Sequence, residues 1–150
     1  MITADPQHRV STLAEIQQLL ATACDPDDRE LIASFAPVVY AEMPDSMALR
    51  LPAPALAARI RAYFRFIART MPPAFQLYKG LPGIHVVVRN PDDAEEAACG
   101  GADGGAHEAT IVETHTPDAP FIFESLKNYF RKAGLRVFST VHPILTVRRQ

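Results

Sequence analysis

The sequence predicts an α+β fold, with N-terminal helices followed by a strand–helix–strand unit on an antiparallel sheet. Apolar residues recur at helical spacing up to about residue 72. From Gly83 the pattern changes to alternation, and a well-delimited helix lies between two later apolar stretches. We therefore expect a helical segment over residues 1–72 and an α/β segment over residues 83–150. This length suits one compact core or two small subdomains.

Composition narrows the classes of protein to which this chain can belong. Of 150 residues, 48% are hydrophobic and 21% charged, as in ordinary globular proteins. The net charge of -2 gives no reason to expect a nucleic-acid or membrane partner. No apolar run is long enough to span a bilayer, and residues 1–10 do not form a secretory signal. Cys24 and Cys99 lie far apart and match no metal spacing. They could form a disulfide with each other, but two reduced thiols in a cytoplasmic protein are the favoured interpretation.

Three helices are expected before residue 72. Thr12 to Glu15 has the form of a capping box, so the first helix should begin near Thr12. Asp25-Pro26 should start the second, which Pro37 should kink, and the third should run from Ala53 to about Thr70. The apolar stripes of the three helices are Leu13, Ile16, Leu20 and Ala23; Leu31, Ile32, Phe35 and Val39; and Leu56, Ile60, Phe64, Ile67 and Met71.

Strands and one more helix are expected after Gly83. Alternation predicts a strand from Ile84 to Asn90-Pro91, and a second over residues 108–116. Residues 92–106 lack large apolar side chains and indicate a flexible insertion. The following helix should be capped by Asp118, with Pro120 in its first turn, and should stop at Gly134. A last strand is expected over residues 135–149, interrupted at His142-Pro143 because proline cannot donate to a ladder.

Residues 108–149 resemble a known family. The run from Ile111 to Ser125 is similar to the N-terminal segment of large bacterial NAD-dependent glutamate dehydrogenases, with Glu124 where that family usually has aspartate. The family's later features match Gly134-Leu135, His142-Pro143 and Arg148-Arg149. Residues 63–66 and 86–91 also look like the preceding helix and strand of that family.

This resemblance implies a non-catalytic regulatory or assembly domain. The whole enzyme would convert L-glutamate and NAD to 2-oxoglutarate and ammonia, and this segment would bind no cofactor itself. Its partners would be other domains or subunits of the same enzyme, in an oligomer. A free-standing ACT-like module for amino-acid sensing or protein interaction is the alternative.

The turn Asp118-Ala119-Pro120 also resembles that of ACT domains, whose strand–turn–helix junction can hold an amino acid. The resemblance implies a ligand site at Thr116, Asp118 and Ala119. Exposed N–H groups at a helix start attract a carboxylate, and an aspartate can hold an ammonium group. Sensing ACT domains usually place glycine after this proline, whereas this chain has Phe121. Its ring should block the ligand's approach or turn into the core, which argues against a working pocket.

No catalytic or metal site is expected. The glycines from Gly100 to Gly105 lack dinucleotide-binding spacing, and none of the lysines (Lys79, Lys127 and Lys132) lies in an active-site motif. The widely spaced histidines (His85, His107, His115 and His142) indicate structural roles, although His115 and His142 could meet if their strands pair. Glu113 is expected on a strand and Glu124 on a helix, and nothing in the sequence indicates that they form a pair of catalytic carboxylates.

The third expected helix carries four arginines, Arg59, Arg61, Arg65 and Arg69. They could bind an anion or an acidic partner, but their pattern favours a solvated helix face.

Overall fold

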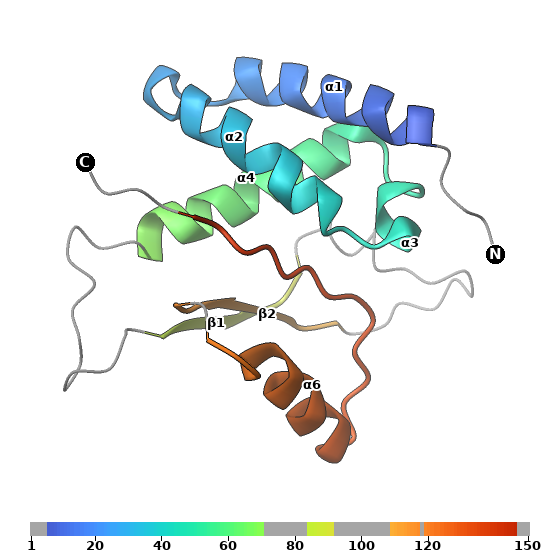
Figure 1. The fold of residues 1–150 in the computed structure, drawn as a ribbon, viewed down its shortest axis with the longest axis vertical. Coiled ribbons are helices and arrows are strands. Elements are labelled where there is room, and N and C mark those ends of the chain that lie inside the picture. Colours follow the sequence, from blue (N-terminus) through green and yellow to red (C-terminus); the bar gives the residue numbers. More distant parts are fainter. Residues whose placement is uncertain (1–5, 71–83, 92–108, 118, 147–150) are drawn as a thin grey trace. The chain divides into compact units, whose positions relative to one another are not determined.

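The chain is mostly helical, with one two-stranded antiparallel sheet, which agrees broadly with the predicted α+β class (Figure 1). A computed structural model describes residues 6–70, 84–91, 109–117 and 119–146. Its elements are α1 (Pro6–Ala23), η1 (Pro26–Asp28), α2 (Arg29–Ala41), α3 (Asp45–Ala48), α4 (Ala53–Thr70), β1 (His85–Arg89), β2 (Ile111–His115) and α6 (Ile122–Lys132). No helix in these ranges is long and apolar enough to cross a membrane.

The chain divides into two compact units. The first comprises Met1–Phe64 together with Thr140–Gln150, and the second comprises Arg65–Ser139. We call them the helical unit and the sheet unit. The predicted boundary between residues 72 and 83 and the predicted insertion at residues 92–106 lie outside the described residues. The predicted division of the chain therefore stays a prediction.

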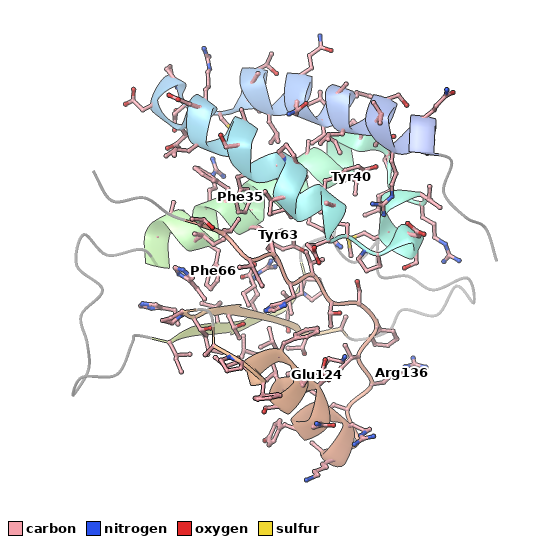
Figure 2. All side chains as sticks on the ribbon, viewed as in Figure 1. Phe35, Tyr40, Tyr63, Phe66, Glu124 and Arg136 are labelled. Carbon is pink, nitrogen blue, oxygen red and sulfur yellow. The ribbon has the colours of Figure 1, made fainter. Side chains whose placement is uncertain are left out.

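The helical unit has a continuous apolar core. Its fully buried side chains include Ile16 of α1, Ile32 of α2 and Leu56 of α4, all at most 1% exposed. Phe35 meets Phe64 edge to face, with 5.6 Å between ring centroids. Figure 2 shows Phe35 and Tyr40 on α2. Seven of the predicted stripe positions are buried, namely Ile16, Leu20, Ile32, Phe35, Val39, Leu56 and Ile60. Leu31 and Ala23 are instead exposed, Leu13, Phe64 and Ile67 are half-buried, and Met71 lies outside the described residues. Burial of these stripes supplies the main driving force for packing the helices together.

Two arginines attach α1 to the rest of the helical unit. The Arg9 guanidinium donates from Nη2 to the Met43 carbonyl at 3.0 Å and to Asp45 Oδ1 at 2.8 Å. At the other end of α1, Arg61 Nη1 donates to the Ala23 carbonyl at 3.1 Å. The last carbonyls of a helix lack intrahelical partners and carry partial negative charge, so a cation there is favourable.

The observed helices correct two expected helix starts and add one short helix. The first helix begins at Pro6 rather than near Thr12. Thr12 lies inside this helix, and its Oγ1 donates to the His8 carbonyl one turn earlier instead of capping the helix start. The second helix is preceded by the 3-10 turn Pro26–Asp28, and Asp25 makes no side-chain cap bond. The short helix α3 was not expected at all. The third predicted helix, from Ala53 to Thr70, is confirmed.

In the sheet unit, β1 and β2 pair antiparallel from His85↔His115 to Arg89↔Ile111. The first predicted strand is confirmed, whereas β2 is shorter than predicted. The end of α6 is confirmed at Gly134, which has a φ of 71°. The Leu135 N–H donates to the Phe130 carbonyl at 2.9 Å, and the Gly134 N–H donates to the Arg131 carbonyl at 3.2 Å. These two bonds form a Schellman motif, which needs a left-handed residue at Gly134.

The predicted last strand does not form over residues 135–146. A strand needs a neighbouring ladder, and within the described residues the sheet contains β1 and β2 alone. Pro143 also removes one backbone donor from the segment. The expected strand–helix–strand unit is therefore a strand followed by a helix and an irregular segment.

Candidate functional site

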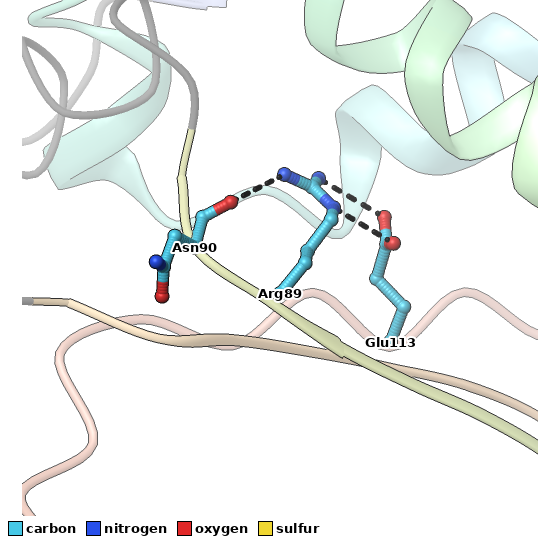
Figure 3. Close-up of polar contacts among 3 residues, drawn as sticks. All are labelled: Arg89, Asn90 and Glu113. Atoms are coloured by element: carbon cyan, nitrogen blue, oxygen red, sulfur yellow. Dashed lines mark hydrogen bonds and ion pairs between the residues drawn. The ribbon is translucent and has the colours of Figure 1, made fainter.

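The sheet is held in register by an ion pair between its two strands (Figure 3). Arg89 donates from Nε to Glu113 Oε2 at 3.1 Å and from Nη2 to Glu113 Oε1 at 3.3 Å. A third bond runs from Arg89 Nη1 to the Asn90 carbonyl at 3.4 Å. The Glu113 side chain is only 11% exposed, so this two-pronged contact is shielded from water. A one-residue slip would place the two side chains on opposite faces and break the contact.

The two glutamates singled out in the sequence serve different contacts. Glu113 binds Arg89 across the sheet, whereas Glu124 accepts from Lys127 one turn along α6 at 3.1 Å. Each carboxylate therefore has its own cation, and the structure gives no reason to treat them as an acid–base pair.

Two histidines lie opposite each other on the same face as this ion pair. The register pairs His85 with His115, and their rings are stacked with centroids 6.2 Å apart and planes at 28°. Burial, and then the charge of His85, lower the pKa of His115 from its usual 6.5. The strand pairing of His115 with His142 that the sequence allowed does not form, because His142 is not in a strand.

The other face of the sheet is apolar and exposed. Side chains alternate between faces, so Val86, Val88, Val112 and Thr114 share one face, which Ile84 extends. The exposed fractions are 64% for Ile84, 55% for Val86, 65% for Val88 and 38% for Val112. By contrast, His85, Arg89, Glu113 and His115 on the more polar face are all half-buried. That face also carries half-buried Ile111 and Val87, which is 38% exposed. The apolar face is thus the less covered of the two.

The predicted ligand turn lies between β2 and α6. Thr116 is half-buried, and its hydroxyl donates to the Pro117 carbonyl at 3.0 Å. Ala119 is exposed, and Asp118 lies outside the described residues. The helix begins at Ile122, so the N-cap is Phe121 rather than the expected Asp118. No ligand contact is defined by this arrangement, and the assignment of a ligand site stays a prediction.

Phe121 adopts an unusual conformation in this turn. Its φ is 67°, in the left-handed region that favours glycine, and its side chain is 79% exposed. The ring therefore does not turn into the core, which was one of its two expected positions. The Ser125 N–H donates to the Phe121 carbonyl at 2.8 Å, so the strained residue supplies the first acceptor of α6.

The arginines of α4 do not form a uniform patch. Arg59 is 8% exposed and donates from Nη1 to Met47 Sδ at 3.2 Å. Arg61 binds the end of α1, while Arg65 and Arg69 are exposed. The expected solvated face therefore holds for Arg65 and Arg69 but is wrong for Arg59, whose guanidinium lies within the helical unit.

Within the described part of the chain there is little other candidate chemistry. There, no group of three or more His, Cys, Asp or Glu residues is arranged to hold a metal ion. Cys24 is a free thiol, whereas Cys99 and His107 lie outside the described residues.

Replacing Glu113 with glutamine should loosen the sheet. The variant keeps one oxygen acceptor but loses the negative charge and one of the two shielded hydrogen bonds, and a bond to a charged group is worth about 1.5–3 kcal/mol. Amide hydrogen exchange of β1 and β2 should accelerate by about tenfold or more. The matched control is Glu124→Gln, because its pair with Lys127 is exposed and should matter by only about 0.3–0.5 kcal/mol. Equal effects of both variants would contradict the structural role given to the Arg89–Glu113 pair.

Stability of the sheet unit should fall in mild acid because of His115. Its pKa is lowered in the folded chain, so the unfolded chain binds the proton more readily. The resulting stabilisation is present above the unfolded pKa of 6.5 and is lost as the pH falls through the lower folded value. Urea unfolding across this pH range should show a shallower pH dependence for His115→Gln than for the wild type. The same substitution at exposed His8 should leave that dependence unchanged.

Comparison with known proteins gives a family. Residues 35–150 match the family model described as glutamate dehydrogenase, ACT1 domain. The match covers well over half of the chain, from within α2 through the sheet and α6 to the last residue, and leaves α1 outside. No curated protein and no solved structure matches the chain.

Proposed function

The chain belongs to the glutamate dehydrogenase ACT1 domain family, and on that basis we propose that it is a non-catalytic regulatory or assembly region of a large, cytoplasmic NAD-dependent glutamate dehydrogenase. The NAD specificity and the large size follow from the resemblance of residues 108–149. The whole enzyme would convert L-glutamate and NAD to 2-oxoglutarate and ammonia at an active site outside these residues. Other domains or subunits of the same enzyme would be the partners.

The exposed apolar face of the sheet is the observation that carries this proposal. Val86 and Val88 are more than half exposed and lie side by side with Val112 across the strands. Contiguous apolar surface of this kind marks interaction sites, because covering it releases ordered water. Full burial of a valine side chain contributes about 1.5 kcal/mol or more, so even partial cover of this face favours association.

The strand edges add to this surface. In the described part of the chain each strand has one neighbour, so the outer edge of each offers backbone groups for further pairing. The Arg89–Glu113 pair on the opposite face fixes the register, and the apolar residues are thereby presented on a defined platform. A rigid apolar platform suits an assembly role better than a catalytic one.

The proposal is tested on the natural polypeptide. An antibody raised against this chain should detect, in a native extract, a band much larger than 16.5 kDa. In that polypeptide, Val88→Glu should weaken assembly by about tenfold or more, because docking would bury an unpaired charge. Light scattering of the purified enzyme measures the loss of assembled mass.

Val10→Glu is the matched control, since Val10 is 70% exposed on α1 and lies outside the sheet face. It should leave the assembled mass unchanged. A natural band at 16.5 kDa would contradict the proposed enzyme and favour the free-standing interaction module. Unchanged assembly in Val88→Glu would contradict docking through the sheet face.

Amino-acid sensing is the second candidate function, and the backbone at Phe121 favours it. The φ of 67° at this residue is a glycine-type conformation at the position where sensing ACT domains usually carry glycine. Phe121 therefore has a backbone conformation that suits glycine, with a ring added to it. The site would comprise Thr116, Asp118 and Ala119.

Calorimetric titration with glutamate, aspartate and other amino acids tests the sensor. Binding to the folded chain should release or absorb heat and raise the unfolding temperature, and Phe121→Gly should strengthen it by removing the ring. Gly134→Ala is the control for backbone effects, because it alters the other end of α6 at a φ of 71°. Absence of heat and of thermal stabilisation in both wild type and Phe121→Gly would exclude this function.

A further inference from the structure

The paired histidines mark one end of the sheet. His85 is the first residue of β1 and His115 the last of β2, so they lie at the end away from the Arg89–Ile111 connection. They are 30 positions apart in the sequence. They lie on the opposite face from Val86 and Val88, and the proposed docking surface therefore makes no use of them.

We propose that His85 and His115 together bind a divalent transition-metal cation of the class that imidazole prefers, namely Zn²⁺, Cu²⁺ or Ni²⁺. The cation would link β1 to β2 at the end of the sheet that has no covalent connection. This inference does not depend on membership of the glutamate dehydrogenase family.

The ring separation allows one cation to reach both imidazoles. A metal–nitrogen bond is about 2.1 Å long, and a ring centroid lies about 1 Å behind its nitrogen, so rings sharing a cation have centroids at most about 6.5 Å apart. The observed 6.2 Å lies within this limit, near its upper end. The rings are stacked with their planes at 28°, so both side chains must rotate to direct a ring nitrogen at a shared cation. Directly opposite positions in an antiparallel pair allow this, because their Cα atoms are only about 4.5–5.5 Å apart.

Local electrostatics are compatible with a cation. Burial and the neighbouring His85 lower the pKa of His115, which keeps its ring neutral and able to act as a metal ligand near pH 7. Glu113 lies two residues from His115 on the same face, but its charge is matched by Arg89. The adjacent ion pair therefore adds no net positive charge that would repel the metal.

Two protein ligands set the strength and the role of the site. Among the described residues no third His, Cys, Asp or Glu completes a cluster, so water would fill the other coordination positions. Binding should be weaker and more reversible than at structural zinc sites with four protein ligands. The cation would nevertheless close a chain segment of 30 positions, and closing a long segment restricts the opened state of the sheet.

The test uses the whole 150-residue chain without a polyhistidine tag, titrated with ZnCl₂ at pH 7.5. Zinc at about 100 times its dissociation constant should slow amide exchange of β1 and β2 about 100-fold. His85→Gln and His115→Gln should each abolish this slowing, whereas His8→Gln should retain it. Imidazole NMR signals of the wild type should shift for His85 and His115, which keeps the test valid if a variant does not fold.

Two further readouts identify the ligand type. The metal competes with protons for the imidazole nitrogens, so its affinity should fall as the pH is lowered. Cu²⁺ should bind more tightly than Ni²⁺, and Mg²⁺ should not bind. The proposal is overturned by unchanged zinc binding in both single variants, by no binding at about 1 mM zinc, or by equal binding of Mg²⁺.

Discussion

The antiparallel register of β1 and β2 is the constraint on which the functional surfaces depend. Because side chains alternate along a strand, this register alone decides that three valines gather on one face and two histidines on the other. The shielded Arg89–Glu113 pair enforces the register, since any odd slip separates the two charges. A short two-stranded sheet has little stability by itself, so one well-placed ion pair matters more here than it would in a large sheet.

The two units differ in how completely they bury their apolar side chains. The helical unit buries its apolar stripes, with Ile16, Ile32 and Leu56 almost inaccessible to water, and Arg9 and Arg61 bind the ends of α1. The sheet unit leaves its most apolar face more exposed than its polar face. A folded chain retains such an arrangement more readily when another surface covers the apolar face in the assembled protein. Because the chain belongs to a glutamate dehydrogenase domain family, the covering surface would come from the remaining parts of such an enzyme.

Features determined by nearby residues could be predicted from the sequence. The bounds of α4 follow from Ala53-Pro54 and a regular stripe, and the end of α6 follows from Gly134. Features that depend on distant partners could not be predicted in the same way. A β-prone segment at residues 135–146 has no ladder to join, and the Thr12 motif imitates a cap while its hydroxyl binds one turn back. The pairing of His85 with His115 could not be predicted from the sequence, because 29 residues separate them.

The turn into α6 shows how a local rule can fail at a site of interest. A left-handed backbone costs a non-glycine residue about 1–2 kcal/mol, and Phe121 accepts this cost without a side-chain cap bond. Its ring is 79% exposed, so burial of the ring provides little compensation. The other end of α6 uses Gly134 for the same backbone region and avoids the penalty. The strain at Phe121 is therefore not a general requirement of this helix, and it is confined to the turn that joins β2 to α6.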